Sequence, residues 1–413
     1  MLNIHFETFT LSNGLKVIVH EDHSIPKAIV NILYNVGSRD EEADKTGFAH
    51  LFEHLMFEGS VNIPHYDTEL QKVGGDNNAF TSSDITNYYL SLPSNCLETA
   101  FWLESDRMLE LAFSQERLDN QKSVVIEEFK QRYINQPYGD AMNVLRDLHF
   151  TTHSYKWATI GKEIAHVEEA TLDYVKSFFY GYYAPNNATL VVAGDVKKEK
   201  VLRLAEKWFG GIPKRTLKKH AIPQEPAQTE ARFMEKRGKV PFTGIYKMFH
   251  VPAHRERAYY VTDILTDVLS NGKTGKLFQS LVIDKQVVSS VGAFTWGMAD
   301  PGIVSINAQL GEGKTIEMYE KGLRETLNQL QSLTQDDLDI IKNKIQSAFV
   351  MEKLHVLNKA MGIAFSDFLG DAELINKTPE IYASITLAEV KEAAATFLEE
   401  SNSSTLYYLP EEA

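Results

Sequence analysis

The sequence predicts an α+β fold of two similar domains, each a mixed or antiparallel sheet backed by helices. The first half alternates short β-branched and aromatic runs, typical of strands, with segments of helical periodicity. The second half repeats the first: Leu118-Asp119 recurs as Leu338-Asp339, and Thr189-Leu190 as Thr405-Leu406, in the same order and at nearly the same spacing. Such ordered matches indicate a duplicated domain of about two hundred residues.

The strands of the first domain are predicted from β-rich runs and the turns beside them. Asn13-Gly14, flanked by strand-like residues, is the strongest short hairpin signal. A Gly-Gly turn at 73–78 precedes one of the other runs. These runs are rich in Val, Ile, Leu, Phe and Tyr and cover residues 28–36, 79–81, 86–92 and 188–194.

Helices are predicted from apolar periodicity and from capping residues. Residues 97–111 have helical spacing. Ser114 is the expected N-cap of a helix from 115 to about 133, which Asn135-Gln136-Pro137 ends. A further helix is expected at 171–183.

The domain boundary is predicted where turn and linker residues concentrate. Glycines and prolines cluster from Gly210 to Pro226. The predicted division is therefore a first domain at residues 1–210, a linker at 211–232 and a second domain at 233–413.

The composition is that of an ordinary globular protein and excludes several partners. Hydrophobic residues make up 43% and charged residues 24% of the chain, which leaves ample apolar surface for large cores. A net charge of −14 without a basic patch argues against a nucleic-acid partner. Cys96 is the only cysteine, which excludes an internal disulfide. No apolar run approaches the ~18 residues of a membrane span, and the N-terminus lacks signal-peptide features, so we expect the cytoplasm.

His50, Glu53 and His54 form the chemical motif of the chain, in the order His-x-x-Glu-His. These positions share one face of a helix, so the three side chains are expected to project together. Two neutral imidazoles one turn apart can both reach a single Zn²⁺, and the carboxylate beside them can take a proton from a metal-bound water. The order is the inverse of the H-E-x-x-H metalloprotease helix.

A catalytic metal site needs a third protein ligand, and the internal repeat narrows the candidates. The second half has no histidine where the motif should recur, near 267–271, and it has alanine at the position of Glu128. This parallel loss favours Glu128, or its neighbour Glu127, as the third ligand. His149 and His153 also have helical spacing, but no carboxylate is adjacent, so we interpret them as structural or exposed.

Over essentially its whole length the chain resembles the pitrilysin-type zinc metallopeptidases (inverzincins, family M16), in particular the shorter bacterial and mitochondrial-processing-peptidase-like branch. Four segments carry the resemblance: GFAHLFEHLMF at 47–57, NAFT at 78–81, VVIEE at 124–128 and YAPNNATL at 183–190. The first and third together are highly specific.

The resemblance implies a metalloendopeptidase that hydrolyses oligopeptides or unfolded segments. It implies one Zn²⁺ per chain, with His50, His54 and Glu128 as ligands. Glu53 is the implied general base, which accepts a proton as zinc-bound water attacks the peptide carbonyl.

The resemblance also implies how substrate binds and how chains assemble. In the family, the segment corresponding to Asn78, Ala79 and Phe80 is an edge strand that pairs with the main chain of the peptide. Two such chains, like or unlike, are expected to close into a clam-shell chamber that admits peptides and excludes folded proteins.

The chain departs from the family pattern at three positions. Gln121 stands where a glutamate is usual; it can support the site by hydrogen bonding but supplies no charge. Val282 and Ser289 stand where many short members have an Arg and a Tyr that grip substrate. A metal-bearing subunit active only in a heterodimer with an Arg/Tyr-bearing partner is therefore one alternative to a self-sufficient homodimer. A non-catalytic structural subunit is the other, and the intact motif disfavours it.

Overall fold

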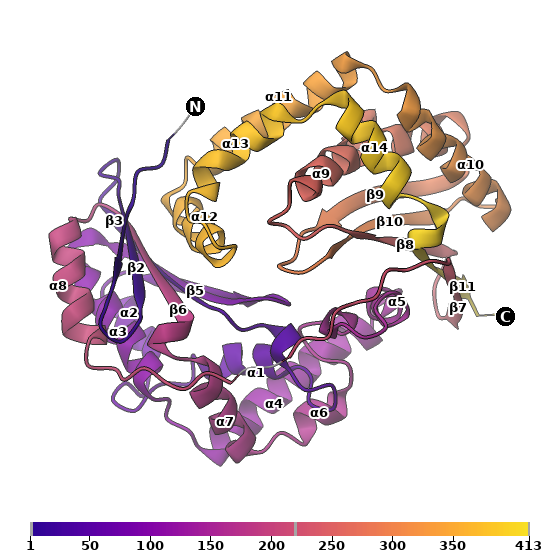
Figure 1. Cartoon of the computed structure of the whole chain (residues 1–413). Helices are drawn as coiled ribbons and strands as arrows, with labels where there is room; N and C mark the ends of the chain where they lie inside the picture. The colour runs from indigo at the N-terminus through magenta and orange to yellow at the C-terminus, as the bar shows by residue number, and fades with distance from the viewer. Residues whose placement is uncertain (1–2, 219–220, 412–413) are drawn as a thin grey trace. The chain divides into compact units, whose positions relative to one another are not determined.

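The computed structural model describes residues 3–218 and 221–411, so residues 219–220 of the predicted linker and the last two residues of the predicted second domain lie outside the described residues. The chain forms two compact units (Figure 1). Unit 1 contains the described residues up to Phe129, together with Trp157–Ile222 and Val350–Lys377. Unit 2 contains Lys130–Lys156, Pro223–Phe349 and the described residues from Thr378 onward. The chain changes unit at Ile222 within the predicted linker, but each unit also includes a segment from the other half of the sequence.

Unit 1 is built on a six-stranded sheet in the order β1-β2-β6-β3-β5-β4. All neighbouring strands are antiparallel except β2 and β6, which are parallel. The predicted hairpin is formed by the first two strands, and Gly14 in its turn has a φ of +91°. The strands are β1 (Glu7–Thr10), β2 (Lys16–Glu21), β3 (Lys27–Tyr34), β4 (Asp76–Thr81), β5 (Thr86–Pro93) and β6 (Ala188–Gly194).

The helices of unit 1 surround this sheet, and their apolar faces supply its core. They are α1 (Phe48–Leu55), α2 (Tyr66–Lys72), α3 (Leu97–Leu109), α4 (Gln115–Phe129), α6 (Ile164–Glu168), α7 (Leu172–Tyr182), α8 (Lys198–Phe209) and α12 (Val356–Phe368).

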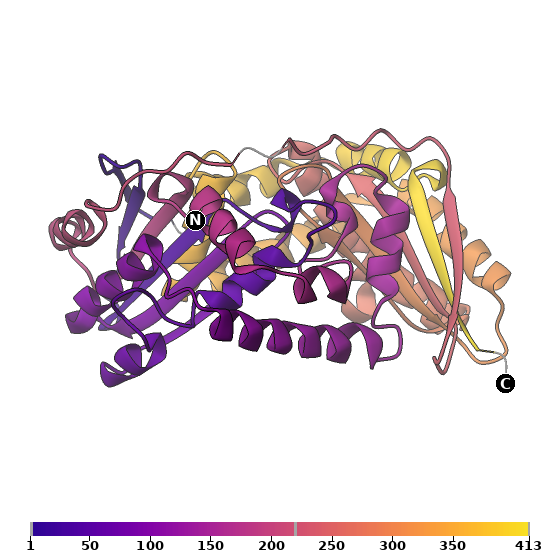
Figure 2. The same cartoon turned by 90° about the horizontal axis from the view of Figure 1, so that it is seen from below.

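Unit 2 is built on a five-stranded sheet in the order β7-β11-β8-β10-β9. Only β7 and β11 run parallel; they are the pink and yellow strands side by side in Figure 2. The strands are β7 (Arg232–Gly238), β8 (Gly244–Val251), β9 (Val288–Trp296), β10 (Gly302–Leu310) and β11 (Ser403–Pro410). The helices are α5 (Ala141–His149), α9 (Arg257–Ser270), α10 (Ile316–Asn328) and α14 (Leu387–Phe397), with α11 (Gln335–Glu352) and α13 (Leu374–Ser384) at the changes of unit.

The two sheets share one topology, which confirms the predicted duplication. The order β7-β11-β8-β10-β9 matches β2-β6-β3-β5-β4 strand for strand, and the single parallel pair falls at the same place in both. The repeated Thr-Leu pairs lie in the equivalent strands β6 and β11. β1 has no counterpart in the five-stranded sheet.

Each sheet is covered by a helix from the other half of the sequence (Figure 1). α12 packs on β3 and β6, where Ala360 and Ile363 contact a core that contains Ile29 and Val191. α5 packs on the equivalent strands β8 and β11, where Leu145 joins a core with strand residues of unit 2. This reciprocal exchange explains why the compact units are not the contiguous segments 1–210 and 233–413.

Several predicted elements differ from the observed ones by one or two residues at an end, and two differ more. The strand predicted at 79–81 begins earlier, at Asp76, because the turn closes at Gly74, which has a φ of +71°. The helix predicted from 115 to about 133 is α4, which continues after Phe129 as a π-helical turn to Ile134. Ser114 caps it as expected, accepting the N–H of Arg117 (3.3 Å). No described helix is long and apolar enough to span a bilayer.

Candidate metal centre

The N-terminus of α1 is fixed by a glycine and a buried acid. Gly47, the N-cap, has a φ of +88°, and a Cβ there would lie 2.5 Å from the carbonyl oxygen of Ile160. The carboxylate of Glu41 accepts the main-chain N–H of Gly47 (3.0 Å) and of Ala49 (2.7 Å), and Nε1–H of Trp157 (3.1 Å). Burial raises the pKa of Glu41 to about 8, although these hydrogen bonds act in the opposite direction. Sequence reasoning gave Glu41 no role, because it is one of four acids within residues 40–44 and nothing in the sequence distinguishes it from the others.

The apolar face of α1 orients its polar face. Phe48, Leu51 and Phe52 are buried, and the Phe52 ring lies 4.3 Å from the Tyr183 ring, centroid to centroid. With this face held against the core, the remaining positions of the helix carry His50, Glu53 and His54 on the half-buried side. The predicted helix and the predicted common face are both observed.

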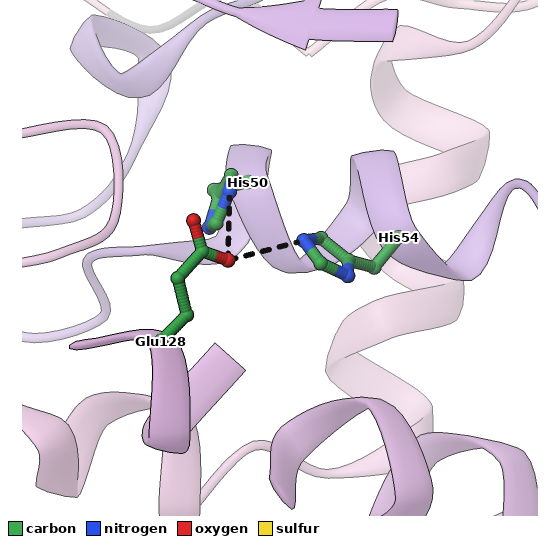
Figure 3. A group of neighbouring side chains, drawn as sticks. All are labelled: His50, His54 and Glu128. Atoms are coloured by element: carbon green, nitrogen blue, oxygen red, sulfur yellow. Dashed lines mark ion pairs between the residues drawn. The ribbon is translucent and has the colours of Figure 1, made fainter. Parts of the chain in front are cut away.

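α4 brings Glu128 to the two histidines of α1 (Figure 3). Oε2 of Glu128 lies 3.7 Å from Nε2 of His50 and 3.6 Å from Nε2 of His54. Within residues 3–218 and 221–411 these side chains form the only group of three or more potential metal ligands, with ligand atoms within 4.8 Å of one another. Glu127, the alternative from the sequence, is not in the group and is exposed.

The donor set and its spacing fit a zinc ion. A tetrahedral zinc with bonds of about 2.0–2.1 Å separates its ligand atoms by roughly 3.3 Å, close to the two spacings that meet at Glu128. Two imidazoles and one carboxylate are a known catalytic donor set that leaves a fourth position open. The three side chains are between 13% and 24% exposed, so small molecules can reach them.

Gln121 and Thr81 hold the polar side chains around this group. Nδ1–H of His54 donates to Oε1 of Gln121 (3.2 Å), so the supporting hydrogen bond predicted for Gln121 is observed. The hydroxyl of Thr81, at the end of β4, donates to Oε2 of Glu53 (2.5 Å). Sequence reasoning gave Thr81 no role, because the contact depends on how β4 lies beside α1.

The predicted substrate strand is an edge strand. β4 is the last strand of its sheet and pairs only with β5, with Asn78 opposite Tyr89. The main-chain N–H of Ala79 donates to Oδ1 of Asn78 (2.8 Å), which indicates that it points away from β5. Phe80 is 41% exposed. The three residues therefore lie where an added strand could pair.

The other histidine pair is structural. The His149 ring stacks on His250 at 3.6 Å between centroids, and its Nδ1 lies 3.0 Å from the Ser404 hydroxyl. Burial lowers the pKa of His149 well below its usual value. Nε2 of His153 lies 3.4 Å from Asp300. Both histidines are buried, so the structural interpretation is confirmed and the exposed alternative is wrong.

The described residues of the second half hold no group of three potential metal ligands, and the two positions considered do not carry the Arg and Tyr of the family pattern. Val282 lies half-buried in the π-helical turn Phe278–Asp284. Ser289 is exposed on β9, and its hydroxyl donates to the carbonyl of Gln309 (3.3 Å).

The fold and this site define a class of protein. Residues 16–173 match the family described as insulinase (peptidase family M16), and residues 169–345 match the family described as the peptidase M16 inactive domain. The chain belongs to peptidase family M16.

Individual relatives agree with this assignment. The chain is 28% identical to the zinc protease PqqE of Helicobacter pylori, over 98% of this chain and 93% of that protein. It is 24% identical to the uncharacterized zinc protease YmxG of Bacillus subtilis, over 83% of each. The crystal structure of a protease from Helicobacter pylori superposes with a TM-score of 0.91 at 27% identity, over 99% of this chain and 100% of that one. These comparisons support a peptidase role for the chain.

Proposed function

We propose that this chain is a zinc-dependent endopeptidase that hydrolyses oligopeptides or unfolded segments and binds one Zn²⁺ per chain. The observation that carries the proposal is the meeting of His50, His54 and Glu128 beside Glu53. Zinc in this group would act as a Lewis acid toward water and the scissile carbonyl. The named relatives are zinc proteases, which agrees with this metal.

Glu53 is the general base in this proposal. Its carboxylate accepts a proton from the attacking water and can return it to the leaving amine. The hydrogen bond from Thr81 to Oε2 restricts rotation of the carboxylate, so that the carboxylate is positioned before substrate arrives. The three metal ligands hold their positions on two helices rather than on loops, which favours a fixed geometry.

The substrate binds along β4 in this proposal. An extended peptide would pair with the free edge through the N–H of Ala79, which exchanges its bond to Asn78 for one to the peptide carbonyl. Because main-chain pairing needs an extended segment, the strand selects unfolded peptides rather than a particular sequence. Phe80 would offer an apolar contact.

The Ala79→Pro variant tests the strand. Proline removes the outward N–H but leaves the bonds of the flanking residues to β5, so KM should rise with little change in kcat. Ala79→Val keeps the main-chain N–H at the same position and serves as the matched control. An unchanged KM for Ala79→Pro would count against pairing at this edge.

A chain active only beside a related partner is the second candidate. The residues that favour it are Val282 and Ser289, since neither can supply a cationic or phenolic grip on substrate. In this second candidate the active form is a heterodimer with a related subunit, rather than a homodimer of this chain. Size analysis of the natively purified protein separates the two: a single polypeptide species would contradict the heterodimer.

The proposal is tested by cleavage of an unstructured, internally quenched peptide. The zinc-loaded chain should cleave it, and Glu53→Gln should not, while binding zinc to the same extent. Zinc bound without cleavage by the isolated chain would favour the partner-dependent version. A chain that binds no zinc and cleaves no peptide would overturn the enzyme assignment.

A further inference from the structure

We propose that Glu58 is a positioning residue of the metal centre, which acts through Gln121 to keep Nε2 of His54 unprotonated and available to the metal. The inference rests on the proposed zinc site and adds a residue to it. Glu58 follows α1, and Gln121 lies on α4, so the contact connects the two helices that carry the metal ligands.

Three side chains form a continuous hydrogen-bonded chain. Nδ1 of His54 lies 3.2 Å from Oε1 of Gln121, and Nε2 of Gln121 donates to Oε1 of Glu58 at 2.5 Å. At the other side of the imidazole, Nε2 of His54 lies 3.6 Å from Glu128. This row of hydrogen bonds therefore begins at the proposed metal position and ends at the carboxylate of Glu58.

The direction of every bond follows from the chemistry of Glu58. An ionised carboxylate can only accept hydrogen bonds, so the NH₂ of the Gln121 amide must face it. The amide carbonyl then faces His54, whose Nδ1 must carry the hydrogen. In a neutral imidazole this leaves the lone pair on Nε2, the atom that faces the metal position.

Gln121 alone does not impose this direction. Its amide could turn by half a rotation and present the NH₂ to His54, which would then need an unprotonated Nδ1 and a hydrogen on Nε2. That tautomer cannot bind a metal through Nε2. Glu58 removes the choice, and it also provides the negative charge that Gln121 lacks.

The backbone holds Glu58 in place for this contact. The N–H of Glu58 donates to the carbonyl of Leu55 (3.1 Å), which continues α1 by one turn. Gly59 follows with a φ of +102°, and a Cβ there would lie 2.5 Å from the carbonyl of Pro64. The chain therefore turns away directly after Glu58.

Zinc affinity, measured by competition with a chromophoric chelator, is the first readout. Glu58→Gln should bind zinc about 10–100-fold more weakly than the wild type, the usual cost of losing a residue that orients a metal ligand. The melting temperature of the metal-free protein should stay unchanged. Glu116→Gln, at an exposed position on the first turn of α4, removes the same charge without touching this chain of bonds and should bind as the wild type does.

Exchanging the two groups gives the sharper result. In a Gln121→Glu background, the new carboxylate accepts from His54 directly, and an amide at position 58 can donate to it. Glu58→Gln should therefore strengthen zinc binding in that background, the opposite of its effect in the wild type. A purely structural role for Glu58 would not produce this change of sign.

Two results would overturn the inference. One is a Glu58→Gln variant that binds zinc as tightly as the wild type; the other is a double variant weaker than Gln121→Glu alone. A wild-type chain that binds no zinc would instead overturn the proposed function, and the role of Glu58 with it.

Discussion

α1, which carries two of the proposed metal ligands, and its counterpart α9 show how two copies of one scaffold differ in the use of one helix. Both helices follow the equivalent strands β3 and β8. α1 has 8 residues, and its polar face is half-buried with His50 and His54 on it. α9 has 14 residues; nine of them are buried, and seven of these belong to the apolar core of unit 2. Most of the surface of α9 is packed in the core, whereas α1 has one half-buried polar face, which carries the proposed metal ligands.

Outside the site, the two halves keep the same supporting contacts. Thr171 and Thr386 cap the equivalent helices α7 and α14 by accepting the N–H three residues on (3.3 Å each). Lys122 of α4 donates to the carbonyl of Ala170, and Lys342 of α11 donates to that of Ala383. The comparison indicates that the sheet, caps and core maintain the fold. The residues of the proposed metal site can therefore be absent while these supporting contacts are kept.

The largest expected effect is on kcat, and it should arise from a substitution on α1 but not from one on α9. Glu53→Gln on α1 should lower kcat by about 10²–10⁴-fold, since it removes the general base without altering the shape of the side chain. Asp267→Asn on α9, in the region that corresponds to the motif, should leave kcat unchanged. Peptide hydrolysis assays check both, and a comparable loss of kcat in both variants would contradict the division of labour.

The next effect should be equal in the two halves. Leu118 on α4 and Leu338 on α11 are equivalent and almost fully buried. Replacing either with alanine should lower the free energy of unfolding by about 2–5 kcal/mol, through lost apolar burial and the remaining cavity. Denaturant titration measures this, and chelator competition should show unchanged zinc affinity for Leu338→Ala.

A pH effect should be specific to the first half. The folded pKa of Glu41 is about 8, above its ordinary value of 4.5, so its contribution to stability is fully present below pH 4.5 and is lost as pH rises through 8. Glu41→Gln does not titrate. As the pH rises from about 5 to 9, the free energy of unfolding of the wild type should therefore fall relative to that of Glu41→Gln. A difference between the two that does not change with pH would contradict the raised pKa.

The smallest expected effect compares the two caps. Thr171→Ala should cost about 1 kcal/mol of stability, the usual value of an N-cap. Thr386→Ala should cost more, because the hydroxyl of Thr386 also donates to Oε2 of Glu389 (2.8 Å), a bond that alanine cannot make. Thermal unfolding of the two variants measures the difference, and equal costs would mean that the additional bond contributes nothing.

The parts of the site that could be predicted from sequence are those set by local geometry or by the repeat. The spacing of His50, Glu53 and His54 determines their common face once a helix forms. The loss of both motif and glutamate from the second half indicated Glu128 or its neighbour Glu127, and the family resemblance implied Glu128. Glu41 and Glu58 could not be found in this way, since their contacts depend on where α4 and the loop before α1 lie in space.

The fold was predictable in its elements but not in its division into units. Strands and caps leave local patterns, so the hairpin at Asn13-Gly14 and the cap at Ser114 could be predicted. The packing of α5 and α12 on the sheets of the opposite halves leaves no such pattern, because an amphipathic helix does not reveal which sheet it covers. The residues of β4 before Ala79 are polar and lack a strand-like composition.

The measurement that tests the account most directly is the zinc content of three purified variants beside the wild type. The wild type should hold one zinc per chain, Glu128→Ala should lose it, and Glu127→Ala and His149→Ala should keep it. Zinc retained by Glu128→Ala, or two zinc ions in the wild type, would contradict the assignment of the metal to α1 and α4.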